Sequence, residues 1–167
     1  MKGIKDMSKV ILVCGKICSG KTTYAKNLLD ESQYTVLLSI DEIILALFGR
    51  HVGENRNKVV NRTQRYLLDK SLELINSGVS VILDWGFWTH TDRQQTSEFF
   101  SSKGVKLEWH CLDIDESVRN RYISKRMDNS AGSESDFYFV DKDTLKELDG
   151  IFEKPAQDEV DVWVEKL

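Results

Sequence analysis

The sequence has few of the residues that divide a chain into separate domains or cross-link small ones. Pro155 is its only proline, so it has no proline-rich linker of the kind that separates domains. Its three cysteines, Cys14, Cys18 and Cys111, are odd in number and lack the spacing of a zinc site or a disulfide framework. Reduced thiols of this kind are typical of the cytoplasm, which is the location we expect.

Long apolar runs and a surplus of positive charge are also missing. No apolar run approaches the roughly 18 residues that a membrane-spanning helix needs. The formal net charge is −4, which argues against an extended nucleic-acid-binding surface because such surfaces carry a basic excess. We therefore expect one globular domain over residues 1–167, with no membrane contact and without nucleic acid as its main partner.

The most specific motif is the eight-residue run GKICSGKT, which spans Gly15 to Thr22. It matches the phosphate-binding P-loop pattern G-x-x-x-x-G-K-[S/T]. The run 9–14 before it has the apolar composition of a strand, and residues 23–29 after it have that of a helix. This context is the one that the motif requires, so we interpret the run as a nucleotide-binding loop rather than a chance glycine turn.

The residue types of this loop indicate its chemistry. Glycine reaches the backbone conformations that let a chain curl around an anion, and the free N–H groups at the start of the next helix attract phosphate. Lys21 is expected to contact the β- and γ-phosphates, and the Thr22 hydroxyl to hold Mg²⁺. The residues predicted to bind the nucleotide are Gly15, Lys16, Ile17, Cys18, Ser19, Gly20, Lys21, Thr22 and Thr23.

Two aspartates stand where predicted strands end. Asp41 follows the run 34–39, and Asp84 closes the near-continuous apolar run 79–84, which is typical of a buried parallel strand. Ligands bind at the carboxyl ends of strands in open α/β sheets, so both carboxylates are candidate site residues. Asp84 is the candidate that helps Thr22 to hold Mg²⁺. Asp41 fits equally well as the cap of the helix that follows it.

Three aromatic residues crowd into the short run Trp85–Trp88 after Asp84. Aromatic side chains usually belong to the core, but a loop this rich in them also suits a pocket for a second substrate. Arg93, a little further along the chain, either faces that site or pairs with an acid.

The predicted helix 116–127 carries several cations, among them Arg119, Arg121 and Arg126. Such a helix is either a solvated basic face with acidic partners or a lid. The arginines of a lid would close over bound phosphates and offset the charge that develops during phosphoryl transfer. The polar stretch 128–136 that follows suits the tip of a mobile lid.

Strand patterns alternate with helix patterns along the chain, which predicts a parallel sheet with helices on both faces. The predicted strands cover residues 9–14, 34–39, 79–84, 105–112 and 159–164. The predicted helices cover residues 20–31, 40–48, 55–76, 92–102, 116–127 and 143–153.

With these motifs placed, the chain resembles the small P-loop kinases of the AAA-type "predicted kinase" group, which is related to chloramphenicol phosphotransferase, zeta toxin and the kinase domain of polynucleotide kinase. The ending Phe152–Glu159 is similar to the F-x-x-P…E run before the last strand of that family. The resemblance implies a three-layer α/β P-loop NTPase fold with a five-stranded parallel sheet in the order 2-3-1-4-5. It also implies a small helical lid over about 116–140.

The resemblance implies a role for each matching residue. Asp41 occupies the place of the carboxylate that accepts the proton of the acceptor hydroxyl, and Asp84 closes the strand that supports Mg²⁺. Arg121 and Arg126 stand where lid arginines are expected, with Arg119 as their substitute and as a further residue that binds the nucleotide. ATP and Mg²⁺ are the implied cofactors.

The chain departs from this family at two places. Relatives often carry arginine three residues after the proposed base, where this chain has Ile44, and small polar residues where it has Trp85–Trp88. These departures weaken any inference that the acceptor matches theirs, in particular a polynucleotide 5′-end, and the aromatic run favours an acceptor with an apolar or ring-bearing part.

We predict an ATP-dependent kinase that phosphorylates a hydroxyl group of a small molecule, with Lys21, Asp41, Arg121 and Arg126 as its catalytic residues. Two alternatives remain open. One is an ATP-binding or ATP-hydrolysing regulatory module, and the other is a kinase of nucleic-acid 5′-hydroxyl ends. ATP is favoured over GTP because the sequence has no guanine-reading N-K-x-D motif.

Overall fold

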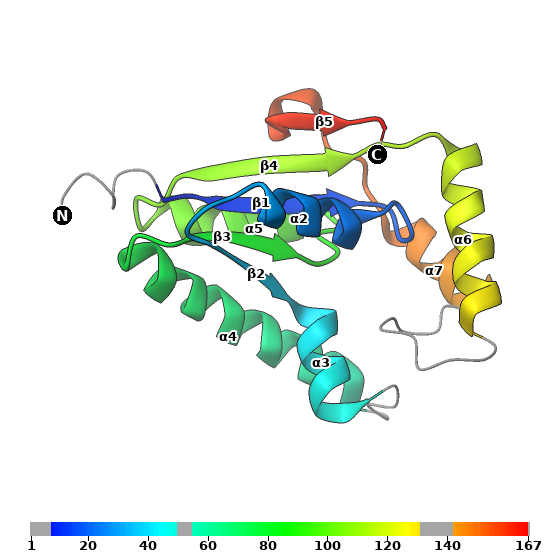
Figure 1. Ribbon diagram of the computed structural model, residues 1–167, viewed down its shortest axis with the longest axis horizontal. Helices are drawn as coiled ribbons and strands as arrows, with labels where there is room; N and C mark the ends of the chain where they lie inside the picture. Colours follow the sequence, from blue (N-terminus) through cyan, green and yellow to red (C-terminus); the bar gives the residue numbers. More distant parts are fainter. Residues whose placement is uncertain (1–7, 50–54, 131–141, 167) are drawn as a thin grey trace.

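The computed structural model of the protein describes residues 8–49, 55–130 and 142–166. At its centre is a sheet of five strands: β1 (Val10–Gly15), β2 (Thr35–Ser39), β3 (Ser80–Asp84), β4 (Leu107–Leu112) and β5 (Val162–Val164). The strands run parallel in the order β2-β3-β1-β4-β5. Their carboxyl ends therefore point to one edge of the sheet (Figure 1). This arrangement confirms the expected fold class and strand order.

β1 lies at the centre of the sheet, and its composition suits that place. All of its residues are buried, and a strand that is covered on both faces needs apolar side chains at every position. Leu12 is level with Leu83 of β3 on one side and with Trp109 of β4 on the other. The P-loop therefore follows a fully buried strand.

Helices cover both faces of the sheet and extend beyond its carboxyl edge. They are α2 (Lys21–Asp30), α3 (Ile40–Phe48), α4 (Arg56–Asn76), α5 (His90–Ser101), α6 (Glu116–Ser130) and α7 (Lys142–Ile151), with the short 3-10 turn η2 (Gln157–Glu159) before β5.

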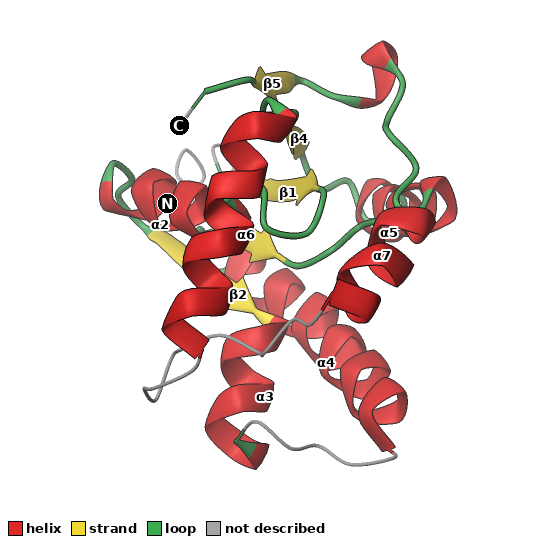
Figure 2. Ribbon diagram, turned by 90° about the vertical axis from the view of Figure 1, so that its right-hand side faces the viewer, coloured by secondary structure: helices red, strands yellow, loops and turns green. Residues whose placement is uncertain are grey.

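Alternate residues of β1 face two different helical layers. Ile11 packs with Ala25 of α2 on one face of the sheet. Leu12 packs with Ile75 of α4 and Phe100 of α5 on the other face. Helices α6 and α7 lie past the carboxyl ends of the strands, on the same side as the P-loop (Figures 1 and 2). The fold is thus a three-layer sandwich with two further helices at the edge where ligands bind.

The helices and strands lie where the sequence places them, with ends that differ by a few residues. The helix predicted over 92–102 begins earlier, at His90, because Thr89 rather than Thr91 caps it. The Thr89 hydroxyl accepts a hydrogen bond from the Asp92 N–H at 3.0 Å, and the Asp92 carboxylate accepts one from the Thr89 N–H at 3.3 Å. This reciprocal pair is a capping box.

The expected lid region of about 116–140 contains α6. Residues 131–141, which include part of its predicted tip, lie outside the described residues. None of the described helices is long and apolar enough to cross a membrane.

Candidate functional site

The P-loop joins β1 to α2 through two glycines in conformations that other residues adopt poorly. Gly15 has φ +148° and Gly20 has φ +92°. A Cβ atom on Gly15 would lie 2.8 Å from the Leu112 carbonyl oxygen and 2.9 Å from Ser19 Oγ, which is closer than real Cβ contacts. Glycine is required at this position because the end of β4 approaches the loop so closely.

Helix α2 begins directly after the P-loop, so the free N–H groups of its first turn lie beside the loop. Its N-cap is Gly20, and no side chain caps these N–H groups. Uncapped donors and the positive end of the helix dipole together attract an anion. The start of α2 therefore has the chemistry of a phosphate-binding site.

Lys21 is the cation that the loop holds. Its Nζ donates hydrogen bonds to the carbonyl oxygens of Gly15 at 3.0 Å and Lys16 at 2.8 Å. Burial lowers the pKa of Lys21, while the negative charges of Asp84 and Asp41 act against that shift. A desolvated ammonium group binds phosphate oxygens more strongly than a solvated one, because the local dielectric is low.

Asp84 and Thr22 supply two oxygen ligands beside Lys21. Asp84 is the last residue of β3 and is only 5% exposed. Burial raises the pKa of its carboxyl group, against the effects of a hydrogen bond from the Thr22 hydroxyl and of the Lys21 charge. Within the described residues no group of three or more His, Cys, Asp or Glu side chains could hold a metal. Two protein oxygens suit Mg²⁺, which usually keeps water and phosphate oxygens as its other ligands.

Asp41 lies in the first turn of α3 and is exposed. Its interpretation as the helix cap is wrong, because the Ser39 hydroxyl caps the helix by accepting from the Glu42 N–H. Ser39 and Asp84 are level in the parallel pair of β2 and β3. The Asp41 charge acts on the pKa values of both Lys21 and Asp84, so the three groups share one edge of the sheet.

The three arginines of α6 occupy different environments. Arg119 is 3% exposed and its Nε donates to the Ile17 carbonyl oxygen at 2.9 Å. Arg126 is half-buried, and its Nη1 lies 3.7 Å from Cys18 Sγ. Arg121 is exposed and lines a shallow depression on α6. Two of the three predicted lid arginines therefore already contact the P-loop.

Two acidic residues contribute to this region although the sequence gives no motif for them. Glu116 pairs with Lys16 of the P-loop and with Arg119. Asp149 of α7 pairs with Arg119. Acidic residues on surface helices are too common for their pattern alone to show which of them reach a site.

The aromatic run after β3 is mostly part of the core. Phe87 is 3% exposed, with its ring centroid 4.9 Å from that of Trp85 and 5.0 Å from that of Trp109. Trp85 and Trp88 are both half-buried. Trp85 packs against the core, whereas the Trp88 indole fills the space beside Gly86, where a Cβ atom would lie 2.5 Å from Trp88 Cε2. Trp88 is thus the member of the run that remains available to a ligand.

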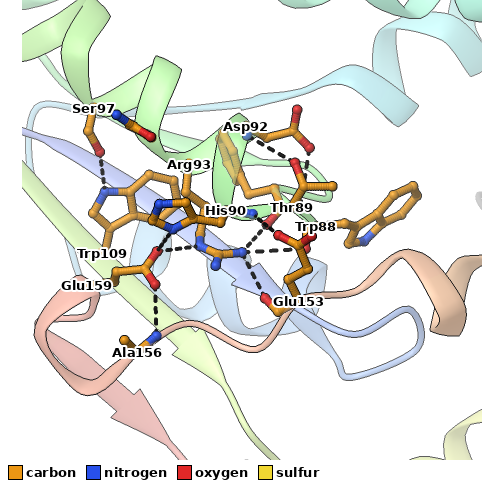
Figure 3. A network of polar contacts seen from close by, with 12 residues as sticks. Trp88, Thr89, His90, Asp92, Arg93, Ser97, Trp109, Glu153, Ala156 and Glu159 are labelled. Atoms are coloured by element: carbon orange, nitrogen blue, oxygen red, sulfur yellow. Dashed lines mark hydrogen bonds and ion pairs between the residues drawn. The ribbon is translucent and has the colours of Figure 1, made fainter.

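Arg93 pairs with an acid, which decides between the two possibilities that the sequence allows. Its Nε donates to Glu159 at 3.1 Å, and its Nη1 donates to the carbonyl oxygens of Phe87 at 3.2 Å and Glu153 at 3.0 Å. The Trp88 indole points away from this network (Figure 3). The buried guanidinium therefore holds the backbone of the aromatic run and leaves the Trp88 ring free.

The arrangement can bind a polyphosphate and act on it. Uncapped N–H groups and Lys21 supply positive charge, Thr22 and Asp84 supply oxygen atoms of the kind that could hold Mg²⁺, and Asp41 supplies an exposed carboxylate at the same edge. Phosphoryl transfer needs positioning and charge compensation of this kind more than covalent chemistry.

Comparison with known protein families gives one match. A family model described as an AAA domain matches residues 10–155 of the chain. None of the curated proteins compared with the sequence matches it.

Solved structures share the fold at low sequence identity. A putative kinase from Chloroflexus aurantiacus has a TM-score of 0.70 and 17% identity, over 95% of this chain and 86% of that chain. An APS kinase, CysC, from Mycobacterium tuberculosis in complex with AMPPNP and APS has a TM-score of 0.62 and 14% identity, over 95% and 88%. A chain of the Pnkp1/Rnl/Hen1 RNA repair complex has a TM-score of 0.68 and 17% identity over 84% of this chain. The present chain spans 42% of the length of that last protein.

Proposed function

The chain belongs to the AAA domain family, and from this premise we propose that it is an ATP-dependent kinase that transfers the γ-phosphoryl group to a hydroxyl group of a small molecule. Within the family, we place it with the small kinases related to chloramphenicol phosphotransferase, zeta toxin and polynucleotide kinase. The proposal includes one kinase domain over residues 1–167, a lid over about 116–140 and a cytoplasmic location.

The nucleotide half of the proposed site is the P-loop and the start of α2. The loop N–H groups and Lys21 bind the phosphates of ATP, with residues Gly15 to Thr23 around them. Thr22 and Asp84 hold Mg²⁺, which neutralises phosphate charge when it is bound. The Thr22 hydroxyl lies close enough to Asp84 to lower the pKa of its carboxyl group, and this closeness supports the assignment.

The acceptor half is built on Asp41. Its carboxylate accepts or orients the proton of the acceptor hydroxyl, which makes the oxygen a better nucleophile. Arg121 and Arg126 of α6 offset the charge on the transferring group. The observation that carries the proposal is the convergence of Lys21, Asp84 and Asp41 at the carboxyl ends of three strands. Asp84 is level with Val13 of β1 and with Ser39 of β2, and the three charges act on one another.

Trp88 supports an acceptor with a planar ring. It is half-buried, and Arg93 and the Glu153 N–H hold its carbonyl oxygen at 3.4 Å and 2.8 Å. A fixed backbone lowers the entropy cost of stacking a ligand on the ring. The solved APS kinase is a relative in fold with a small-molecule substrate in its complex.

The test is ATP consumption by the pure protein with Mg²⁺, first alone and then with classes of hydroxyl acceptors. The panel contains nucleosides, sugars, aminoglycosides, chloramphenicol-like compounds and 5′-hydroxyl oligonucleotides. Stimulation by a ring-bearing small molecule, with one phosphate gained per ATP consumed, is the expected result. ATP binding with no phosphorylated product from any class would overturn the proposal in favour of a regulatory module.

A cationic face on α4 favours a second candidate, a kinase of nucleic-acid 5′-hydroxyl ends. Lys58, Arg62 and Arg65 are exposed and make no ion pair with any other residue in the described ranges, and Tyr66 beside them is 59% exposed. Cations flanked by an exposed aromatic ring suit a single-stranded nucleic acid. This candidate predicts oligonucleotide binding that weakens steeply with salt and with Arg62→Ala. Salt-independent or absent binding would exclude it.

A further inference from the structure

Helix α6 contacts three consecutive residues of the P-loop. Its residues Glu116, Arg119 and Arg126 contact Lys16, Ile17 and Cys18, respectively. The first and last of these contacts involve partly exposed side chains, whereas the middle one is made by a buried guanidinium. The middle contact therefore has the best-defined geometry.

Each of the three nitrogen atoms of the Arg119 guanidinium donates to an acceptor within the protein. Nε donates to the Ile17 carbonyl oxygen at 2.9 Å, Nη1 donates to Glu116 at 3.0 Å, and Nη2 donates to Asp149 of α7. The two carboxylates neutralise the buried charge and fix the plane of the guanidinium. This pattern favours a role in holding the loop over direct contact with a phosphate.

The bond to Ile17 also determines where the next N–H group points. A peptide unit is planar and trans, so the carbonyl of Ile17 and the N–H of Cys18 point in opposite directions. Arg119 draws the carbonyl towards α6. The Cys18 N–H is therefore turned away from α6, and in a P-loop inward-facing N–H groups of this kind bind phosphate.

Cys18 is in a conformation that needs such support. Its φ is +58°, in the left-handed region, and it is the one non-glycine P-loop residue with positive φ. The Cβ atom of an L-residue is crowded there, so the residue is strained unless its surroundings hold it. The Arg119 hydrogen bond to the preceding carbonyl is one such restraint.

We propose that Arg119 is a positioning residue for ATP binding: it holds the Ile17–Cys18 peptide so that the Cys18 N–H faces the phosphates despite the strain at Cys18. The proposal rests on the proposed function only in that the loop binds ATP. Lysine cannot replace arginine here, because a single ammonium group does not reproduce a planar fork that joins one carbonyl and two carboxylates.

The experiment measures the dissociation constant of Mg·ATP for Arg119→Ala in three backgrounds. These are the natural chain, Cys18→Gly and Cys18→Ala. Arg119→Ala alone is expected to weaken binding by about tenfold, the effect of losing one good hydrogen bond to phosphate. Cys18→Gly should recover most of this loss, because glycine adopts positive φ without strain. Cys18→Ala removes the same sulfur atom but keeps the Cβ, so it should recover none.

Two further variants separate positioning from general stability. Asp149→Asn keeps an acceptor for Arg119 but removes the negative charge of that partner, without changing the loop, and should weaken ATP binding in the same direction but less. Asn120→Ala changes an exposed neighbour on α6 and should bind ATP like the natural chain. Thermal unfolding of every variant shows whether it is folded at the binding temperature.

The pattern of rescue decides the proposal. An equal loss of affinity in all three backgrounds, or no loss with Arg119→Ala, would overturn it. The kinase proposal is tested separately, by the formation of phosphorylated product. If no acceptor is phosphorylated but Cys18→Gly selectively restores ATP binding, the kinase proposal is refuted and the role of Arg119 is upheld.

Discussion

The Arg93 guanidinium and the Glu159 carboxylate form an ion pair with Nε and Oε2 3.1 Å apart. The pair joins helix α5 to the 3-10 turn η2 before β5, two elements whose paired residues are 66 positions apart in sequence. His90 Nδ1 lies 3.1 Å from the same carboxylate oxygen (Figure 3). The aromatic run therefore depends on a residue near the end of the chain.

The first prediction concerns the acid stability that Glu159 provides. Partial burial opposes its ionisation, but hydrogen bonds from the Ala156 N–H, Arg93 and His90 outweigh burial and lower its pKa to about 2. An ordinary glutamate titrates at 4.5. Since the folded-state pKa is the lower one, the stabilisation is complete above about pH 4.5 and is lost as the pH falls towards 2.

Glu159→Gln should therefore unfold at a lower temperature than the natural chain at pH 7. Its free energy of unfolding should be lower by roughly 1–2 kcal/mol after allowance for solvent screening, and this difference is its stability deficit. The deficit should shrink as the pH falls from about 4.5 towards 3. Thermal unfolding followed by circular dichroism at a series of pH values measures it. A deficit that stays constant over this range would show that the negative charge of Glu159 does not contribute to the stability of the fold.

The second prediction concerns Lys21. Lys21→Ala removes the buried cation beside the phosphates, and we expect phosphoryl transfer to fall by about 10²–10³-fold or more. The circular dichroism spectrum should match that of the natural chain, because Lys21 bonds only to loop carbonyls. Turnover like that of the natural chain would rule out the proposed mechanism.

The third prediction separates a kinase from a regulatory ATPase. Asp41→Asn keeps the size of an exposed side chain but removes its ability to accept a proton. Acceptor phosphorylation should fall by about 10²–10⁴-fold, the usual contribution of a general base, while the dissociation constant for ATP changes little. If the protein is instead a regulatory module, its basal ATP hydrolysis should be almost unaffected by this change.

The fourth prediction concerns the pH dependence of Mg²⁺ binding. Burial raises the pKa of Asp84, and only the ionised carboxylate is a good Mg²⁺ ligand. At low pH the Asp84 carboxyl group is protonated, so it must lose its proton before Mg²⁺ can bind. The gain in ATP affinity on adding Mg²⁺ should therefore decline on acidification at a higher pH than an ordinary aspartate would give. The protein is titrated with ATP, once in the presence of Mg²⁺ and once in the presence of EDTA, at pH values from about 8 to 5. The ratio of the two dissociation constants measures this gain at each pH. In Asp84→Asn the gain should be small and independent of pH.

The fifth prediction tests the place of Trp88 in the acceptor site. Gly86→Ala puts a Cβ atom where the Trp88 indole now lies, so the ring must turn. KM for the acceptor should rise several-fold while KM for ATP stays constant. Gly150→Ala is the matched control, because a Cβ atom there meets nothing within 4 Å. An unchanged acceptor KM in Gly86→Ala would place the acceptor elsewhere.

The position of the P-loop between β1 and α2 could be predicted from sequence because its signals are local. The residue types and spacing of the motif Gly15–Thr22 are enough to predict the conformation of the loop. Each strand that precedes a site residue is an apolar run. Local pattern also placed Asp41 and Asp84 at strand ends. The order of the strands came from the family resemblance, since hydrophobic period alone does not distinguish one order of parallel strands from another.

The remaining features depend on contacts between distant segments. Arg119 reaches Ile17 across 102 residues and Asp149 across 30, and no periodicity in the sequence marks those partners. Phe87 looked equally suited to a pocket until its packing on Trp109 was known. Asp41 was compatible with a capping role because the sequence does not reveal that Ser39 already fills it.

The strand order has a consequence for how such a protein can change over time. The phosphate loop grows from β1 in the middle of the sheet, whereas Asp41 and α3 follow β2 at its edge. An edge strand has a single neighbour, so substitutions on the exposed face of α3, where Asp41 lies, disturb few other contacts. The two halves of the site can therefore evolve at different speeds. On the proposed function, such changes would alter the acceptor that a lineage uses while its binding of ATP stayed the same.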